Sequence, residues 1–121
     1  MSIFPTKILL ATDGSPDAQL AGTAAADLAN SIDSELHTIT VMGGRAYHAE
    51  RQEIVDELRQ RGRQVLDKQV KKIEGAGGKV AHAYVRLVEE HRDRAILDLA
   101  EELGGGLIVM GSRGLGEYAG P

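Results

Sequence analysis

The chain has 121 residues, no cysteine and a formal net charge of −4 at pH 7. This length suits one domain over residues 1–121, and the lack of cysteine excludes disulfides, thiolate zinc sites and thiol nucleophiles. Acidic and basic residues are interleaved, so no basic stripe points to a nucleic-acid partner. With no apolar run of about 20 residues and no signal-peptide pattern, we expect a soluble, cytoplasmic protein with no membrane partner.

The first predicted unit is a strand, a loop and a helix. Residues 7–12 form a continuous apolar run, typical of a central parallel strand that is covered on both faces. Asp13-Gly14 ends the strand, and Ser15, Pro16 and Asp17 then supply an N-cap, a proline at the first helical position and an acidic residue that the helix dipole favours. The residues that helical spacing places toward the sheet are Leu20, Ala21, Ala24, Ala25, Leu28 and Ala29.

A second strand is predicted over residues 36–42, where β-branched residues precede Gly43-Gly44. A long amphipathic helix follows from about residue 47 to 74, with one buried face formed by Ile54, Leu58, Gly62, Val65, Leu66, Val70 and Ile73. The glycines within residues 75–78 end this helix, and residues 79–86 are predicted as a third strand.

The last predicted elements are a helix over residues 92–103 and an apolar strand over residues 107–110, separated by three glycines. Strands and helices therefore alternate along the whole chain. This order predicts an α/β fold, an open parallel sheet with right-handed crossovers and helices on both faces.

Ligands of such sheets bind beyond the carboxyl ends of the strands, where the winding direction reverses. We expect that crevice between the first and fourth strands, which are followed by residues 11–15 and 110–116. Gly111, Gly114 and Gly116 would allow a close backbone approach and an anion-binding turn. Neither standard phosphate motif is present, so a purely structural turn is the alternative.

Other polar residues each allow two interpretations. Asp13 could accept hydrogen bonds from a ribose hydroxyl or an adenine amino group, or it could close an Asx-turn. Arg113 could contact a phosphate or simply be exposed. The four histidines lack metal-ligand spacing, which favours surface or strand-packing roles; they are His37, His48, His82 and His91.

Three segments, residues 7–15, 35–37 and 107–114, resemble the universal stress protein family, and residues 95–102 also lead into the last strand as in that family. The resemblance covers essentially the whole chain. It implies an adenine nucleotide alpha-hydrolase-like, Rossmann-like fold with strand order 3-2-1-4, in which the family's fifth strand would be missing from this chain. Where the family often has a glycine-containing turn before the third helix, residues 88–93 contain no glycine.

The resemblance also implies a binding site. Nucleotide-binding members share a motif of G, two residues, G, nine residues, then G followed by Ser or Thr. Gly111 and Gly114 match its first two glycines, whereas the third would fall beyond Pro121, so we expect the chain to be C-terminally incomplete. The expected site residues are Ala11, Thr12 and Asp13 at the adenine and ribose end, Val41 against the adenine, Met110 at the border, and Gly111, Ser112, Arg113, Gly114 and Gly116 at the phosphates.

The expected function is a sensor or switch in the stress response that binds ATP, with or without Mg²⁺, or AMP or ADP, and forms a homodimer. One alternative is a dimerisation or interaction protein of the same fold that binds no nucleotide. Another is a slow ATPase or an autophosphorylating protein, with Ser112 or a serine beyond Pro121 as the modified residue. For that chemistry the sequence offers no evident general base.

Overall fold

A computed structural model describes residues 7–44 and 50–111. The elements are β1 (Lys7–Ala11), α1 (Pro16–Ile32), β2 (Glu35–Gly43), α2 (Gln52–Gly75), β3 (His82–Val88), α3 (Arg92–Glu102) and β4 (Leu107–Met110). The predicted alternation of strands and helices is therefore confirmed.

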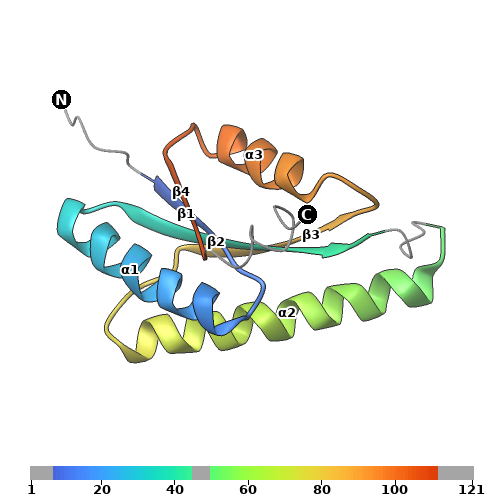
Figure 1. Cartoon of the computed structure of the whole chain (residues 1–121), viewed down its shortest axis with the longest axis horizontal. Coiled ribbons are helices and arrows are strands. Elements are labelled where there is room, and N and C mark those ends of the chain that lie inside the picture. The colour runs from blue at the N-terminus through green and yellow to red at the C-terminus, as the bar shows by residue number, and fades with distance from the viewer. Residues whose placement is uncertain (1–6, 45–49, 112–121) are drawn as a thin grey trace, which may run out of the picture.

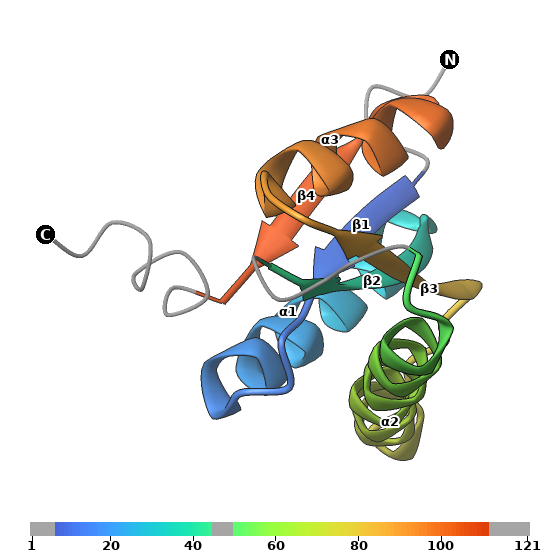
Figure 2. The same cartoon turned by 90° about the vertical axis from the view of Figure 1, so that its right-hand side faces the viewer.

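The described strands form one parallel sheet in the order β3-β2-β1-β4, as predicted. At the centre of the sheet, Leu9 of β1 lies opposite His37 of β2 and Ile108 of β4. Helices α1 and α2 cover one face of the sheet, and α3 lies on the other face (Figures 1 and 2). The winding direction changes at β1, because the chain moves outward to β2 and β3 and then crosses back to β4.

Two apolar layers hold the helices on the sheet. Ile8 and Leu10 of β1 belong to the layer that includes the small side chains of α1, and Leu9 belongs to the layer beneath α3, with Ile96 and Leu99. The side chains of Ile8, Leu9 and Leu10 are all buried. The continuous apolar run of β1 thus reflects a central strand whose two faces are both covered.

The start of α1 agrees with its sequence signals. Ser15 is the N-cap, and its hydroxyl accepts a 3.2 Å hydrogen bond from the Ala18 amide. Pro16 is the first helical residue and Asp17 lies in the first turn. These local features position the loop between β1 and α1, because they determine where the strand ends and where the helix begins.

The buried face of α1 differs in part from the prediction: Ala25 and Ala29 are buried and Ala21 packs against the core as expected, whereas three other residues are exposed. Leu20 is 70% exposed and Leu28 is 37% exposed, and Ala24 is also exposed. The residues that face the interior are small, namely Ala18, Gly22, Ala25, Ala26 and Ala29. The physical reason is the close approach of α1 to the sheet and to α2, which leaves room for alanine and glycine but not for leucine.

Two element boundaries also differ. β3 runs from His82 to Val88 rather than over residues 79–86, because β2 extends to Gly43 and the two strands pair along their length. Helix α2 begins at Gln52. The first residues of the longer helix that we predicted, 47–49, lie outside the described residues.

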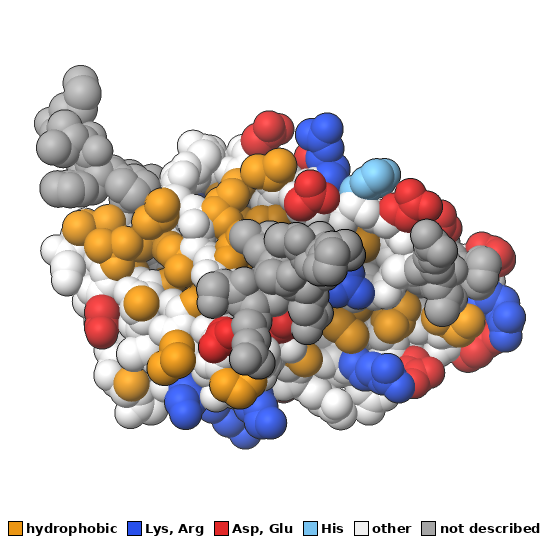
Figure 3. All heavy atoms as spheres, in the orientation of Figure 1, with side chains coloured by type: hydrophobic (Ala, Val, Ile, Leu, Met, Phe, Trp, Pro, Cys, Tyr) orange, Lys and Arg blue, Asp and Glu red, His pale blue; other side chains and the backbone are white. Residues whose placement is uncertain are grey.

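Acidic and basic side chains are interspersed on the described part of the face shown in Figure 3, and they form no continuous basic surface there. Among the described residues, no helix is both long enough and apolar enough to cross a membrane.

Candidate functional site

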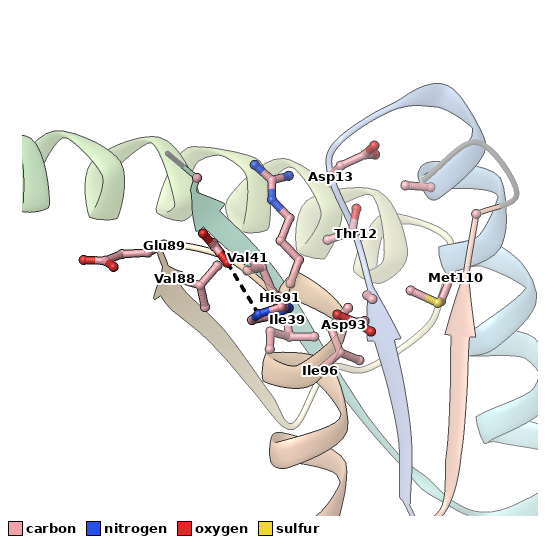
Figure 4. A pocket seen from close by; sticks show the side chains of 16 residues that line it. Thr12, Asp13, Ile39, Val41, Val88, Glu89, His91, Asp93, Ile96 and Met110 are labelled. Atoms are coloured by element: carbon pink, nitrogen blue, oxygen red, sulfur yellow. Dashed lines mark ion pairs between the residues drawn. The ribbon is translucent and has the colours of Figure 1, made fainter. Parts of the chain in front are cut away.

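A pocket of about 560 Å³ lies at the carboxyl ends of the strands. All four strands contribute to it, together with the loop between β3 and α3. Figure 4 shows Thr12 and Asp13 on β1 and its loop, Val41 on β2, and Met110 at the end of β4. The lining residues are Ala11, Thr12, Asp13, Ala18, Ile39, Val41, Gly44, Val88, Glu89, Glu90, His91, Arg92, Asp93, Ile96, Met110 and Gly111.

The structure brings together every described residue that we predicted for the site. These residues are Ala11, Thr12, Asp13, Val41, Met110 and Gly111. The other predicted site residues, Ser112, Arg113, Gly114 and Gly116, lie outside the described residues. The pocket is also wider than the crevice between β1 and β4 that we expected, because it extends across the ends of β2 and β3.

Asp13 closes an Asx-turn and lines the pocket as well. Its Oδ1 accepts a 2.9 Å hydrogen bond from the Ser15 amide. Partial burial raises the pKa of the Asp13 carboxyl, but hydrogen bonds from the Ser15 side chain and backbone, with a smaller contribution from the Arg92 charge, bring the pKa below its ordinary value. At neutral pH the pocket therefore holds a carboxylate, which is a hydrogen-bond acceptor.

Thr12 also lines the pocket, but its hydroxyl is bonded within the protein. The hydroxyl donates a 2.8 Å hydrogen bond to Gln69 Oε1 on α2, and it accepts one of 3.1 Å from the Gly14 amide. Gly14 has a φ of +81°, a left-handed conformation that suits glycine. The loop after β1 is thus held by its own backbone and by α2.

Gly111 lies against the first turn of α1. A Cβ at this position would lie 2.8 Å from the backbone nitrogen of Ala18 and 2.9 Å from the carbonyl carbon of Asp17. The backbone is closely approached at Gly111, and the neighbour is the helix backbone; the anion-binding turn that we expected there stays a prediction. The end of β4 and the start of α1 therefore meet at one edge of the pocket.

Apolar side chains form the wall of the pocket that faces the sheet and α3. Ile39 is fully buried, Ile96 is 8% exposed, and Val41 and Met110 are partly exposed to the pocket. Figure 4 shows Ile39 and Val41 on β2, close to Ile96 on α3. Apolar walls with a few polar groups at the rim are typical of small-molecule pockets, which usually have volumes of about 300–1,000 Å³.

The contribution of residues 88–93 was missed by the sequence analysis. His91 has a φ of +61° and precedes α3, so this chain places histidine in the left-handed position that glycine adopts most easily. The Arg92 guanidinium donates a 3.3 Å hydrogen bond to the Gly43 carbonyl and so joins this loop to the end of β2. Their position along the chain could have predicted them, because they follow β3, and the carboxyl ends of all strands in a parallel sheet lie at the same edge.

The histidines do not form a metal site in the described part of the chain. His37 is buried, with Nδ1 at 3.2 Å from the Tyr84 hydroxyl and Nε2 at 3.0 Å from Glu35 Oε1. The rings of His37 and His82 are 5.6 Å apart, so two residues far apart in sequence meet on neighbouring strands. The described residues contain no group of three or more His, Asp or Glu side chains that could hold a metal ion.

Comparison with known proteins identifies close similarities. A family-level sequence model described as the universal stress protein family matches residues 5–120. A crystal structure of a universal stress protein family member from Burkholderia pseudomallei is 31% identical and has a TM-score of 0.74; the alignment covers 98% of this chain and 89% of that one. A comparison with curated proteins found no match.

Two more distant structures were solved with nucleotides. A universal stress protein in complex with cAMP is 20% identical, with a TM-score of 0.68 and coverage of 92% of this chain and 79% of that one. The universal stress protein from Archaeoglobus fulgidus in complex with dAMP is 21% identical, with a TM-score of 0.63 and coverage of 93% and 84%. At these identities the likeness shows a shared fold.

Proposed function

The chain belongs to the universal stress protein family, and from this premise we propose that it binds an adenine nucleotide in the pocket at the carboxyl ends of β1 to β4. The observation that carries the proposal is the meeting of Asp13, Val41 and Gly111 around one pocket of about 560 Å³. The cAMP and dAMP complexes of structural neighbours add support.

Each part of the ligand has a matching group in the proposed arrangement. The adenine would lie against the apolar wall near Val41 and Met110, where burial of its faces is favourable. The Asp13 carboxylate would accept a hydrogen bond from a ribose hydroxyl or from the adenine amino group. The phosphates would extend toward Gly111 and the following residues, which include Ser112, Arg113, Gly114 and Gly116.

A metal ion would be held mainly by the ligand itself. The described residues offer no group of three metal-binding side chains. Mg²⁺ commonly binds nucleotide phosphates and water with only one or two protein carboxylates. We therefore propose that ATP enters as its Mg²⁺ complex, whereas AMP binds without a metal.

Such binding suits a sensor or switch in a cytoplasmic protein. The ligand would contact loops from all four strands, so its binding energy would stabilise their joint arrangement. A ligand that binds only the folded state at 100 times its dissociation constant adds about 2.7 kcal/mol of stability. Homodimer formation that responds to the nucleotide is part of the same proposal.

Isothermal titration with AMP, ADP, ATP plus Mg²⁺, and adenosine tests the proposal. We expect saturable one-to-one binding by the wild type. Asp13→Ala should weaken it by about tenfold or more, because hydrogen bonds to charged groups contribute about 1.5–3 kcal/mol. Asp27→Ala, on the exposed side of α1, is the matched control and should bind like the wild type.

Wild-type protein that gives no binding heat with any of these compounds would contradict the proposal. Mass spectrometry of the purified, denatured protein provides a second measurement, since a tightly held nucleotide would copurify. Binding that is equally strong in Asp13→Ala would place the ligand elsewhere on the protein.

A further inference from the structure

Gln69 is a buried polar residue on the face of α2 that packs against α1 and the sheet. It is 1% exposed and lies on the same helix face as Leu66 and Ile73, which are also buried. Its Nε2 has no hydrogen-bond partner among the described residues. Burial of an amide with an unbonded group lowers stability, so packing alone does not account for glutamine at this position.

The bonded half of the Gln69 amide reaches the loop after β1. Gln69 Oε1 accepts a 2.8 Å hydrogen bond from the Thr12 hydroxyl. The same hydroxyl accepts a 3.1 Å bond from the Gly14 amide, which can only donate. The Thr12 hydroxyl thus uses a lone pair for the Gly14 amide and its single proton for Gln69 Oε1.

The residues around Gln69 leave space for its side chain. A Cβ on Gly22 of α1 would lie 2.1 Å from Gln69 Nε2, so a glycine is needed where the amide crosses the helix. One turn earlier in α2, Val65 lies beneath the loop, because a Cβ on Gly14 would be 3.3 Å from Val65 Cγ1. Helix α2 thus supports the loop at two points.

The loop held in this way carries the polar group of the ligand pocket. Thr12 is anchored on its other side by a 2.9 Å hydrogen bond from its amide to the Ile39 carbonyl. Asp13 follows directly and lines the pocket, whereas Gln69 does not. A shift of Thr12 would therefore move the neighbouring Asp13 as well, although Gln69 itself does not line the pocket.

We propose that Gln69 is a positioning residue of the ligand pocket. It holds the Thr12 hydroxyl, and through Thr12 it sets the conformation of the loop that presents Asp13. The proposal rests on the function proposed above, since the loop is expected to contact the ligand. It assigns a role in binding to a helix that contributes no residue to the pocket wall.

Gln69→Met tests this role, because methionine has a similar length and removes the acceptor. With AMP as the probe, we expect binding weaker by about three- to tenfold, the range that one neutral hydrogen bond supports. The melting temperature should change little, because the Thr12 hydroxyl loses its acceptor while the unbonded Nε2 is removed as well. Gln64→Met, at an exposed position of the same helix, is the matched control and should match the wild type.

Two measurements separate positioning from a general structural role. Amide hydrogen exchange at Gly14, measured without ligand, should be faster in Gln69→Met, because the Thr12 hydroxyl loses its fixed orientation. Thr12→Val should weaken AMP binding, and Thr12→Val combined with Gln69→Met should be no weaker than Thr12→Val alone. Thr12→Ser keeps the hydroxyl, so it should bind AMP much more tightly than Thr12→Val does.

Wild-type affinity and wild-type Gly14 exchange in Gln69→Met would overturn the proposal, as would additive losses in the double variant. If the wild type binds no adenine compound, the proposed function fails, and the ligand-free Gly14 exchange alone decides whether Gln69 positions the loop. The two failures are therefore distinguishable.

Discussion

Gly111, at the end of β4, approaches the backbone of Ala18 so closely that a Cβ on Gly111 would lie 2.8 Å from the Ala18 nitrogen. A contact of this kind cannot be relieved by a side-chain rotation, because the neighbouring atoms belong to the first turn of a helix. The edge of the pocket formed by β4 and α1 therefore depends on the absence of a side chain at position 111.

Gly111→Ala should accordingly destabilise the protein. We expect a loss of about 1–3 kcal/mol in the free energy of unfolding, the usual range for overpacking, measured by urea denaturation. Gly75→Ala is the control, because a Cβ there meets nothing within 4 Å and the residue is helical. That change should leave stability unchanged or raise it by up to about 1 kcal/mol. Equal effects of the two substitutions would contradict the assigned role of Gly111.

Gly22 and Gln69 should be energetically coupled. Gly22→Ala places a methyl group against Gln69 Nε2, and we expect a loss of about 1–3 kcal/mol in the free energy of unfolding. In a Gln69→Ala background the same change should cost at least about 1 kcal/mol less, because the opposing amide has gone. In a Gln64→Ala background it should cost the full amount. Additivity with Gln69→Ala would show that the two residues do not compete for the same space.

His91 should be a site of stored backbone strain. Its φ of +61° is unfavourable for a residue with a Cβ, and its exposed pairing with Glu90 at 3.5 Å contributes little. We expect His91→Gly to raise the free energy of unfolding by about 0.5–1 kcal/mol, measured by urea denaturation. His91→Ala keeps the Cβ and should give no such gain. A gain of equal size from both variants would point to the imidazole instead of the backbone.

Asp13 should make stability depend on pH in the acidic range. Because its folded-state pKa is lowered, its contribution is fully present above the unfolded-state pKa of about 3.9 and is lost as pH falls through the folded-state pKa. Asp13→Asn keeps an oxygen acceptor for the Ser15 amide but removes the charge near the start of α1. We expect it to cost about 0.3–1 kcal/mol at pH 7 and low salt.

The cost of Asp13→Asn should disappear at strongly acidic pH, where the wild-type carboxyl is protonated. Urea denaturation of both proteins from pH 7 down to pH 2 measures this difference. A difference that stays constant over the whole range would show that the charge of Asp13 has no stabilising role.

Much of the fold was predictable because its signals are local. The apolar run of β1 indicated a strand covered on both faces, and Ser15 with Pro16 indicated the start of α1; both are confirmed. The alternation of elements then predicted the parallel sheet, since right-handed crossovers leave few arrangements. The orientation of α1 was predicted less well, because helical spacing does not distinguish a leucine-containing face from a face of alanine and glycine, and Leu20 is excluded only by the close packing of α1.

The candidate site was predictable where it lies on segments with distinctive local sequence. Asp13 and Gly111 belong to such loops, and the structure brings them to one pocket with Val41. His91 and Arg92 belong to a loop without a distinctive pattern, and they enter the pocket only because β3 ends at the same edge of the sheet. Gln69 looks like an ordinary polar residue of a helix until Thr12, 57 residues away in sequence, is placed against it.

The element order, the start of α1 and the loop after β1 follow from local sequence alone, because strand pattern, capping and glycine conformation act over a few neighbouring residues. The packing of the elements against one another sets which side of α1 is buried, which loops share the pocket and which residue of α2 accepts a hydrogen bond from Thr12. These features depend on the distances between elements, and at such distances a methyl group on Gly22 or Gly111 would be enough to separate them.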